Sequence, residues 1–219
     1  MLRSEHIPFN LFIPFRQDPV FCKNVFNSFL NNCINSIDRI EIEHAPKENG
    51  KIYLNDKTSF DGYIEYTHND NTKGIIGIEV KYTEHEYKLK PNSKEEADCK
   101  NTDSRYYEVS RLSNLYKPEA IDILPSDTFR QVWRNHLLGE SILLTDSDKF
   151  KHFTSLTLFP KGNTYFIETS KEYTELLQSN ENKFLPVTYE NFLSVYIKHC
   201  PDNDYKKWID YLTMRYIVK

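Results

Sequence analysis

Hydrophobic residues recur at helical spacing in some segments of the chain and alternate with polar residues in others. Helical spacing over residues 19–37, preceded by Asp18 as a capping residue and Pro19 in the first turn, predicts an amphipathic helix. Residues 39–44 alternate and predict a strand. Further helices are predicted over residues 103–116, 126–144, 170–178, 189–199 and 204–216, strands over 153–159 and 185–187, and loops over 47–57 and 83–104.

Two more strands are predicted in the middle of the chain, over residues 60–66 and 74–82. Residues 68–74 between them are polar and rich in turn formers, so the two strands form an antiparallel hairpin. In the second strand the side chains of Ile76, Ile78, Val80 and Tyr82 share one face, while Glu79 and Lys81 share the other. The hairpin brings the start of the first strand, with Asp61, beside the end of the second.

Two carboxylates and a lysine at one edge of a sheet are the minimal set for metal-dependent cleavage of a phosphodiester bond. An acid separated by one residue from a lysine is a common pattern, and the chain contains it five times, starting at Glu79, Glu86, Asp98, Glu181 and Asp204. Four of these lie in charge-rich surroundings typical of a solvated surface. The triplet at Glu79 lies within a β-rich run, where the alternative is a half-buried strand with an ordinary solvent face.

An ordered set of segments resembles the PD-(D/E)XK nuclease superfamily, and within it a bacterial restriction-endonuclease-like group. The segments are SEHIPFNLF at residues 4–12, EHAP at 43–46, Asp61, IEVKY at 78–82 and QVWRNHLL at 131–138, so the resemblance covers about residues 4–160. Phe60 stands where the family usually has proline. The chain also opens almost on the first segment, so we expect residue 1 to be an alternative start or a boundary.

The resemblance implies an α/β (α+β) fold with a restriction-endonuclease-like core: a central mixed sheet flanked by helices in the order α-β-β-β-α-β, followed by C-terminal helices. We expect a single nuclease-like domain over residues 1–219, with the core at about 4–160 and a helical extension at about 170–219. The implied activity is a Mg²⁺- or Mn²⁺-dependent endonuclease acting on DNA.

Hard oxygen ligands suit Mg²⁺. Asp61, Glu79 and the carbonyl of Val80 are therefore predicted to hold the metal, and Lys81 is predicted to orient the attacking water or stabilise developing charge, or simply to pair with Glu79. Glu5 is a further candidate because in the resembled fold an acid of the first helix often completes the metal site; the alternative is a plain surface charge. Glu43 on the neighbouring strand is the alternative acid.

Two polar residues of the predicted helix 126–144 are candidates for nucleic-acid contact. Gln131 and Arg134 are three residues apart and share a helical face, where they would touch phosphate or form an ordinary solvated face. His136 on the same helix is predicted to be a packed or capping residue rather than a ligand.

Composition narrows the class of protein. The 219 residues are 39% hydrophobic and 27% charged, which excludes wholesale disorder, and the net charge of −4 argues against indiscriminate nucleic-acid binding. The four cysteines lack zinc-site spacing and are expected to be reduced in a cytoplasmic protein, with no signal peptide and no membrane span.

A homodimer is compatible with the sequence. A non-catalytic nucleic-acid-binding or assembly module that keeps the fold, and an enzyme for RNA or branched DNA, remain open.

Overall fold

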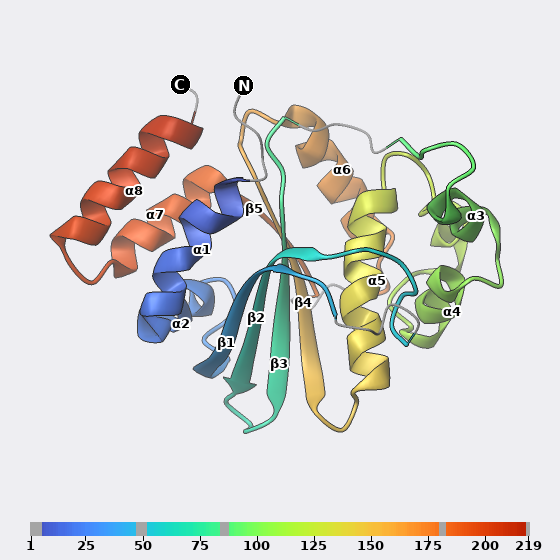
Figure 1. Cartoon of the computed structure of the whole chain (residues 1–219), viewed down its shortest axis with the longest axis horizontal. Helices are drawn as coiled ribbons and strands as arrows, with labels where there is room; N and C mark the ends of the chain where they lie inside the picture. Colours follow the sequence, from blue (N-terminus) through green and yellow to red (C-terminus); the bar gives the residue numbers. More distant parts are fainter. Residues whose placement is uncertain (1–5, 47–51, 84–87, 180–182, 218–219) are drawn as a thin grey trace.

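A five-stranded mixed sheet forms the centre of the protein in the part described by the computed structural model, residues 6–46, 52–83, 88–179 and 183–217 (Figure 1). The strands lie in chain order: β1 (Ile34–His44), β2 (Phe60–His68), β3 (Lys73–Val80), β4 (Phe150–Phe159) and β5 (Phe184–Thr188). β2 is antiparallel to both β1 and β3, whereas β4 is parallel to both β3 and β5. The predicted central mixed sheet is confirmed.

Helices cover both faces of the sheet (Figure 1). One face carries α1 (Ile7–Gln17), α2 (Pro19–Asn27), α7 (Tyr189–His199) and α8 (Asn203–Tyr216). The other carries α3 (Lys94–Lys100), α4 (Arg105–Leu112), α5 (Arg130–Thr145) and α6 (Thr164–Glu175), and a 3-10 turn spans Pro118–Ala120. The predicted order of helix, three strands, helix and strand, with helices at the C-terminus, is confirmed. Over the described residues, no helix combines the length and apolar character needed to span a bilayer.

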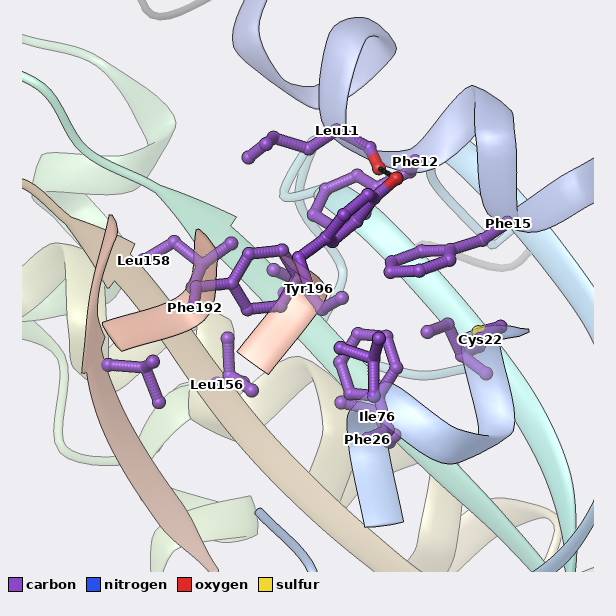
Figure 2. Close-up of a cluster of buried hydrophobic side chains, with 14 of the residues drawn as sticks. Leu11, Phe12, Phe15, Cys22, Phe26, Ile76, Leu156, Leu158, Phe192 and Tyr196 are labelled. Atoms are coloured by element: carbon purple, nitrogen blue, oxygen red, sulfur yellow. Dashed lines mark hydrogen bonds between the residues drawn. The ribbon is translucent and has the colours of Figure 1, made fainter. Parts of the chain in front are cut away.

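Each face of the sheet has its own hydrophobic core. On the α1 side, aromatic rings from distant segments pack together, with Phe15 centred 4.9 Å from Tyr196, whose hydroxyl donates to the carbonyl of Leu11 at 3.1 Å (Figure 2). Ile76, Ile78, Val80 and Tyr82 belong to this core, as the alternation of β3 predicts. Glu79 and Lys81 therefore lie on the opposite face, toward α5.

The predicted helix over residues 19–37 is wrong in its second half. α2 ends at Asn27, and Asn31 and Asn32 adopt left-handed backbone angles that end helical propagation. The side chain of Asn27 then bridges the turn, because it donates to the carbonyl of Ile34 (3.0 Å) and accepts from its N–H (2.8 Å). The apolar residues after the turn, which continue the helical spacing by coincidence, form the start of β1.

Other boundaries also differ from the prediction. The predicted loop over residues 83–104 contains α3, which Ser93 caps by accepting the N–H of Glu96. α6 begins six residues before the predicted position 170 because Asn163 caps it through the N–H of Phe166. α1 was not predicted, since Pro8 and Pro14 interrupt its apparent helical pattern. α7 has the bounds that the sequence predicts.

Candidate active site

The antiparallel register of β2 and β3 sets Asp61 across from Glu79. Gly62 pairs with Ile78, so the residues one step outward, Asp61 and Glu79, lie opposite each other on the same face of the sheet. The Asp61 Oδ2 atom also accepts the main-chain N–H of Val80 at 2.6 Å. The hairpin thus brings together the two carboxylates that the sequence singled out and holds one of them against the main chain of Val80.

Glu79 is buried, and its carboxylate accepts three hydrogen bonds from donors on its own side of the sheet. Its Oε1 atom accepts from Lys81 Nζ at 3.0 Å and from Gln131 Nε2 at 2.8 Å, and its Oε2 atom accepts from Asn135 Nδ2. Lys81 is only 4% exposed. The lysine main chain is fixed too, because its N–H donates to the carbonyl of Leu158 and its carbonyl accepts from the Tyr189 hydroxyl.

A glycine on α5 explains how the two amides reach the sheet. Gln131, Asn135 and Gly139 are spaced by four residues and therefore follow one face of the helix. A Cβ atom on Gly139 would lie 1.9 Å from the ring of Phe153 on β4. The missing side chain lets α5 approach the sheet closely, and this approach places Gln131 and Asn135 within hydrogen-bonding distance of Glu79.

The site concentrates negative charge. Burial raises the pKa of Asp61 to about 8; the charges of Glu79 and, to a smaller extent, Glu43 act in the same direction. The Val80 N–H and the charge of Lys81 oppose this rise. Burial and the neighbouring carboxylates therefore favour the protonated form of Asp61 when no cation is present.

These residues fit a hard divalent cation. Two carboxylates face each other beside a main-chain segment, and burial first, then the charge of Glu79, raises the pKa of Asp61 despite the opposing Val80 N–H and Lys81. Oxygen donors of this kind are the ligands that Mg²⁺ and Mn²⁺ take in proteins. A metal here would be held by Asp61 and Glu79, with the carbonyl of Val80 as the further candidate ligand.

Of the two candidates for an additional acid, Glu43 lies within the described residues and Glu5 does not. The register of β1 and β2 puts Glu43 opposite Asp61, since Ile42 pairs with Gly62 and His44 with Phe60. Glu43 is exposed, and its φ of 55° is in the left-handed region, which an ordinary residue adopts at a cost of about 1–2 kcal/mol. Glu5 lies outside the described residues, so its role stays a prediction.

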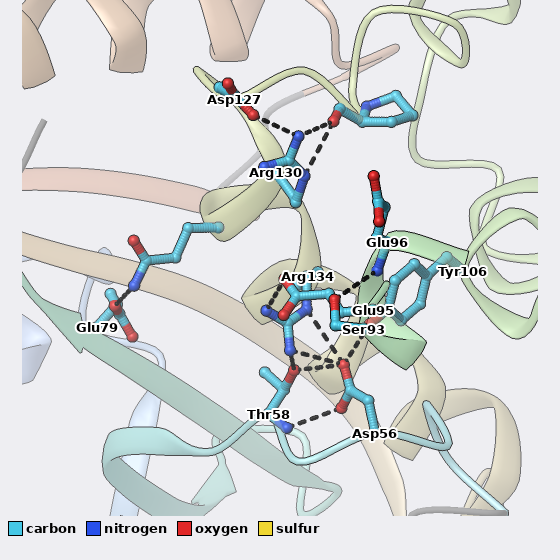
Figure 3. A network of polar contacts seen from close by, with 12 residues as sticks. Asp56, Thr58, Glu79, Ser93, Glu95, Glu96, Tyr106, Asp127, Arg130 and Arg134 are labelled. Atoms are coloured by element: carbon cyan, nitrogen blue, oxygen red, sulfur yellow. Dashed lines mark hydrogen bonds and ion pairs between the residues drawn. The ribbon is translucent and has the colours of Figure 1, made fainter. Parts of the chain in front are cut away.

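Arg134 has a different environment from the one predicted. Its guanidinium binds Asp56 at 2.9 Å, Glu95 at 2.5 Å and the hydroxyl of Thr58 at 2.7 Å, and the side chain is only 11% exposed (Figure 3). It therefore ties α5 to α3 and to the segment before β2. Gln131 contacts Glu79, whereas Arg134 belongs to a separate ion-pair network, and the nucleic-acid contact of these two residues stays a prediction.

Two further residues of the site were not predicted. Asn135 is four residues from Gln131 on a helix face that is otherwise apolar, which is the signal that could have revealed it. Tyr189, whose hydroxyl fixes the main chain of Lys81, gives no such signal, because it comes from the opposite end of the chain. His136 is fully buried and touches the Tyr173 hydroxyl, as expected of a packed histidine.

The fold, together with Asp61 and Glu79 on the paired strands β2 and β3, defines a restriction-endonuclease-like protein. The family model described as the PD-(D/E)XK nuclease superfamily matches residues 1–218, and the chain belongs to this superfamily. Neither the curated proteins nor the solved structures contain a significant match to the chain.

Proposed function

We propose that this protein is a metal-dependent nuclease that hydrolyses phosphodiester bonds in DNA. The observation that supports this most directly is the placement of Asp61 and Glu79 opposite each other, with Lys81 on the carboxylate of Glu79. Membership of the nuclease superfamily supports the same activity. The cytoplasmic location and the homodimer stay predictions from the sequence.

Each residue of the site has a distinct proposed role. Asp61 and Glu79 would hold Mg²⁺ or Mn²⁺ together with the carbonyl of Val80. When bound, the metal would lower the pKa of a water molecule and neutralise charge on the phosphate. Lys81 would orient that water and donate to the phosphate oxygens as their charge increases.

Gln131 and Asn135 would act as positioning residues. They donate to both oxygens of Glu79, so the carboxylate is held in one orientation before substrate arrives. Groups that fix a metal ligand in this way contribute to metal affinity and to activity without touching the reacting atoms. Glu43 or Glu5 would supply the additional acid.

The proposal is tested by incubating the protein with plasmid, linear duplex and single-stranded DNA and with RNA, in Mg²⁺ or Mn²⁺ and with EDTA as the control. We expect metal-dependent DNA cleavage that EDTA abolishes. Cleavage of RNA alone would replace the DNA assignment, and failure of every substrate would favour the non-catalytic binding module.

Substitution of Lys81 separates catalysis from metal binding. Lys81→Met keeps the side-chain volume at a buried position and should lower the cleavage rate about 100- to 1000-fold, as removal of a transition-state donor typically does. Calorimetric titration with Mn²⁺ should show binding retained in this variant, and circular dichroism should show a folded protein. Lys171→Ala, on the exposed side of α6, is the matched control. Wild-type cleavage by Lys81→Met would show that the lysine is structural.

A further inference from the structure

A second group of metal-ligating side chains lies at the opposite end of the sheet. His68 is the last residue of β2, Asp70 lies in the turn that connects β2 with β3, and His152 lies near the start of β4. Ligand atoms of the three residues all lie within 4.8 Å of one another. Asp61 and His68 are seven residues apart on one strand, which is roughly 23 Å at about 3.3 Å per residue, so this group is separate from the candidate active site.

The distances within this group match those between ligands of one small cation. His68 Nδ1 lies 3.0 Å from Asp70 Oδ1, and His152 Nε2 lies 3.3 Å from Asp70 Oδ2. Tetrahedral Zn²⁺ with bonds of about 2.0–2.2 Å separates neighbouring ligand atoms by roughly 3.3 Å. The two imidazole rings are stacked with centroids 4.2 Å apart. His152 Nε2 also lies 2.9 Å from the hydroxyl of Thr72.

The turn holds the carboxylate in place. Thr72 donates to Asp70 Oδ1 through both its hydroxyl (2.5 Å) and its main-chain N–H (2.9 Å). The His68 N–H donates to the carbonyl of Thr72, and the main-chain N–H of Asp70 donates to His68 Nδ1, which requires a lone pair on that nitrogen. Supporting hydrogen bonds of this kind orient ligands around metals in proteins.

The charge balance leaves room for a cation. Among the described residues, the ion-pair partners of the Asp70 carboxylate are the two imidazoles, which are charged only when protonated. The nearby Lys73 is instead engaged by Asp38 and Thr67. His68 and His152 also line a cavity of about 420 Å³, through which an ion has access to the group.

We propose that His68, Asp70 and His152 form a second metal site, which binds a transition-metal dication such as Zn²⁺. Imidazole ligands suit Zn²⁺ and its neighbours in the first transition row, whereas Mg²⁺ prefers oxygen ligands. Three protein ligands leave a fourth position for water or another small ligand. The bound ion would tie the turn between β2 and β3 to β4, two segments that are about 80 residues apart.

The test is calorimetric titration of the full chain with Zn²⁺, carried out in an Asp61→Asn/Glu79→Gln background that removes the carboxylates of the candidate active site. One equivalent should bind, and excess Mg²⁺ should not displace it. His68→Ala and His152→Ala should each abolish this binding. Thr72→Val keeps all three ligands but removes the hydroxyl that contacts both Asp70 and His152, and it should weaken affinity about 10- to 100-fold. His199→Ala, a half-buried histidine elsewhere, should bind as tightly as the parent protein.

A thermal readout tests the same site without relying on the alanine variants. Zn²⁺ should raise the melting temperature of the parent protein, because a ligand that binds only the folded state stabilises it, and Thr72→Val should need more Zn²⁺ for the same rise. The proposal is overturned if the parent protein binds no Zn²⁺. It is also overturned if Thr72→Val and the folded histidine variants bind Zn²⁺ with the same affinity as the parent protein.

Discussion

Replacing Asp61 by asparagine should stabilise the metal-free protein while destroying its activity. The aspartate lies beside Glu79 in a buried, acidic site, and its Oδ2 atom accepts the N–H of Val80. Asparagine is almost the same size, keeps an oxygen for that N–H and carries no charge to repel Glu79. The variant therefore loses repulsion but no packing.

The magnitude follows from the pKa of Asp61, which is raised from 3.8 to about 8 by burial first and then by Glu79. Between these two values the folded protein binds a proton that the unfolded chain has lost, so the stability of the wild-type protein falls as pH rises through this window. Each pKa unit corresponds to about 1.4 kcal/mol. At pH 7 the accumulated cost is about 4 kcal/mol, an upper value because Asp61 is not completely buried.

Urea denaturation of both proteins in EDTA, at pH 5, 7 and 9, measures this difference. The stability of Asp61→Asn should exceed that of the wild type by an amount that grows between pH 5 and pH 9. Mn²⁺ at pH 7 should stabilise the wild type more than the variant, since the metal needs the carboxylate.

Asp56→Asn is the matched control. Burial alone would raise the pKa of Asp56, but Arg134 and the hydrogen bonds of Thr58 and Tyr106 outweigh burial and lower it. This variant should therefore be destabilised. If Asp61→Asn also loses stability at every pH, the inference that the ionised Asp61 carboxylate destabilises the metal-free protein is wrong.

Two further predictions concern α5. Arg134→Met should lower the free energy of unfolding by about 3–5 kcal/mol, because Asp56 and Glu95 lose their buried cation. Chemical denaturation measures this change. Unchanged stability together with weaker DNA binding would instead support the predicted contact between Arg134 and a phosphate. Burial raises the pKa of Glu140 from 4.5 to about 7, partly offset by Lys183, so wild-type stability should fall by up to about 3 kcal/mol between pH 4.5 and pH 8. Glu140→Gln should remove this fall, and parallel stability profiles for the two proteins would contradict it.

The sequence by itself determined the features that depend on local alternation. The β2–β3 hairpin, the faces of β3 and the proximity of Asp61, Glu79 and Lys81 follow from period-two patterning and one polar turn. The order of helices and strands along the chain was predicted from the family resemblance rather than from local alternation. The same reasoning failed at residues 28–37, where apolar spacing continues across a turn and local periodicity cannot distinguish helix from strand.

Only the tertiary structure decided which partner each polar side chain meets. Gln131 and Arg134 are neighbours on one helix, yet one contacts Glu79 and the other Asp56, because α5 lies across the space between the sheet and the α3–α4 layer. Asn135 reaches Glu79 because Gly139 lets the helix approach β4. His68 at the end of β2 and His152 on β4 meet because β3 pairs with both of these strands. Contacts between residues far apart in sequence depend on how elements dock, and no local pattern encodes that docking.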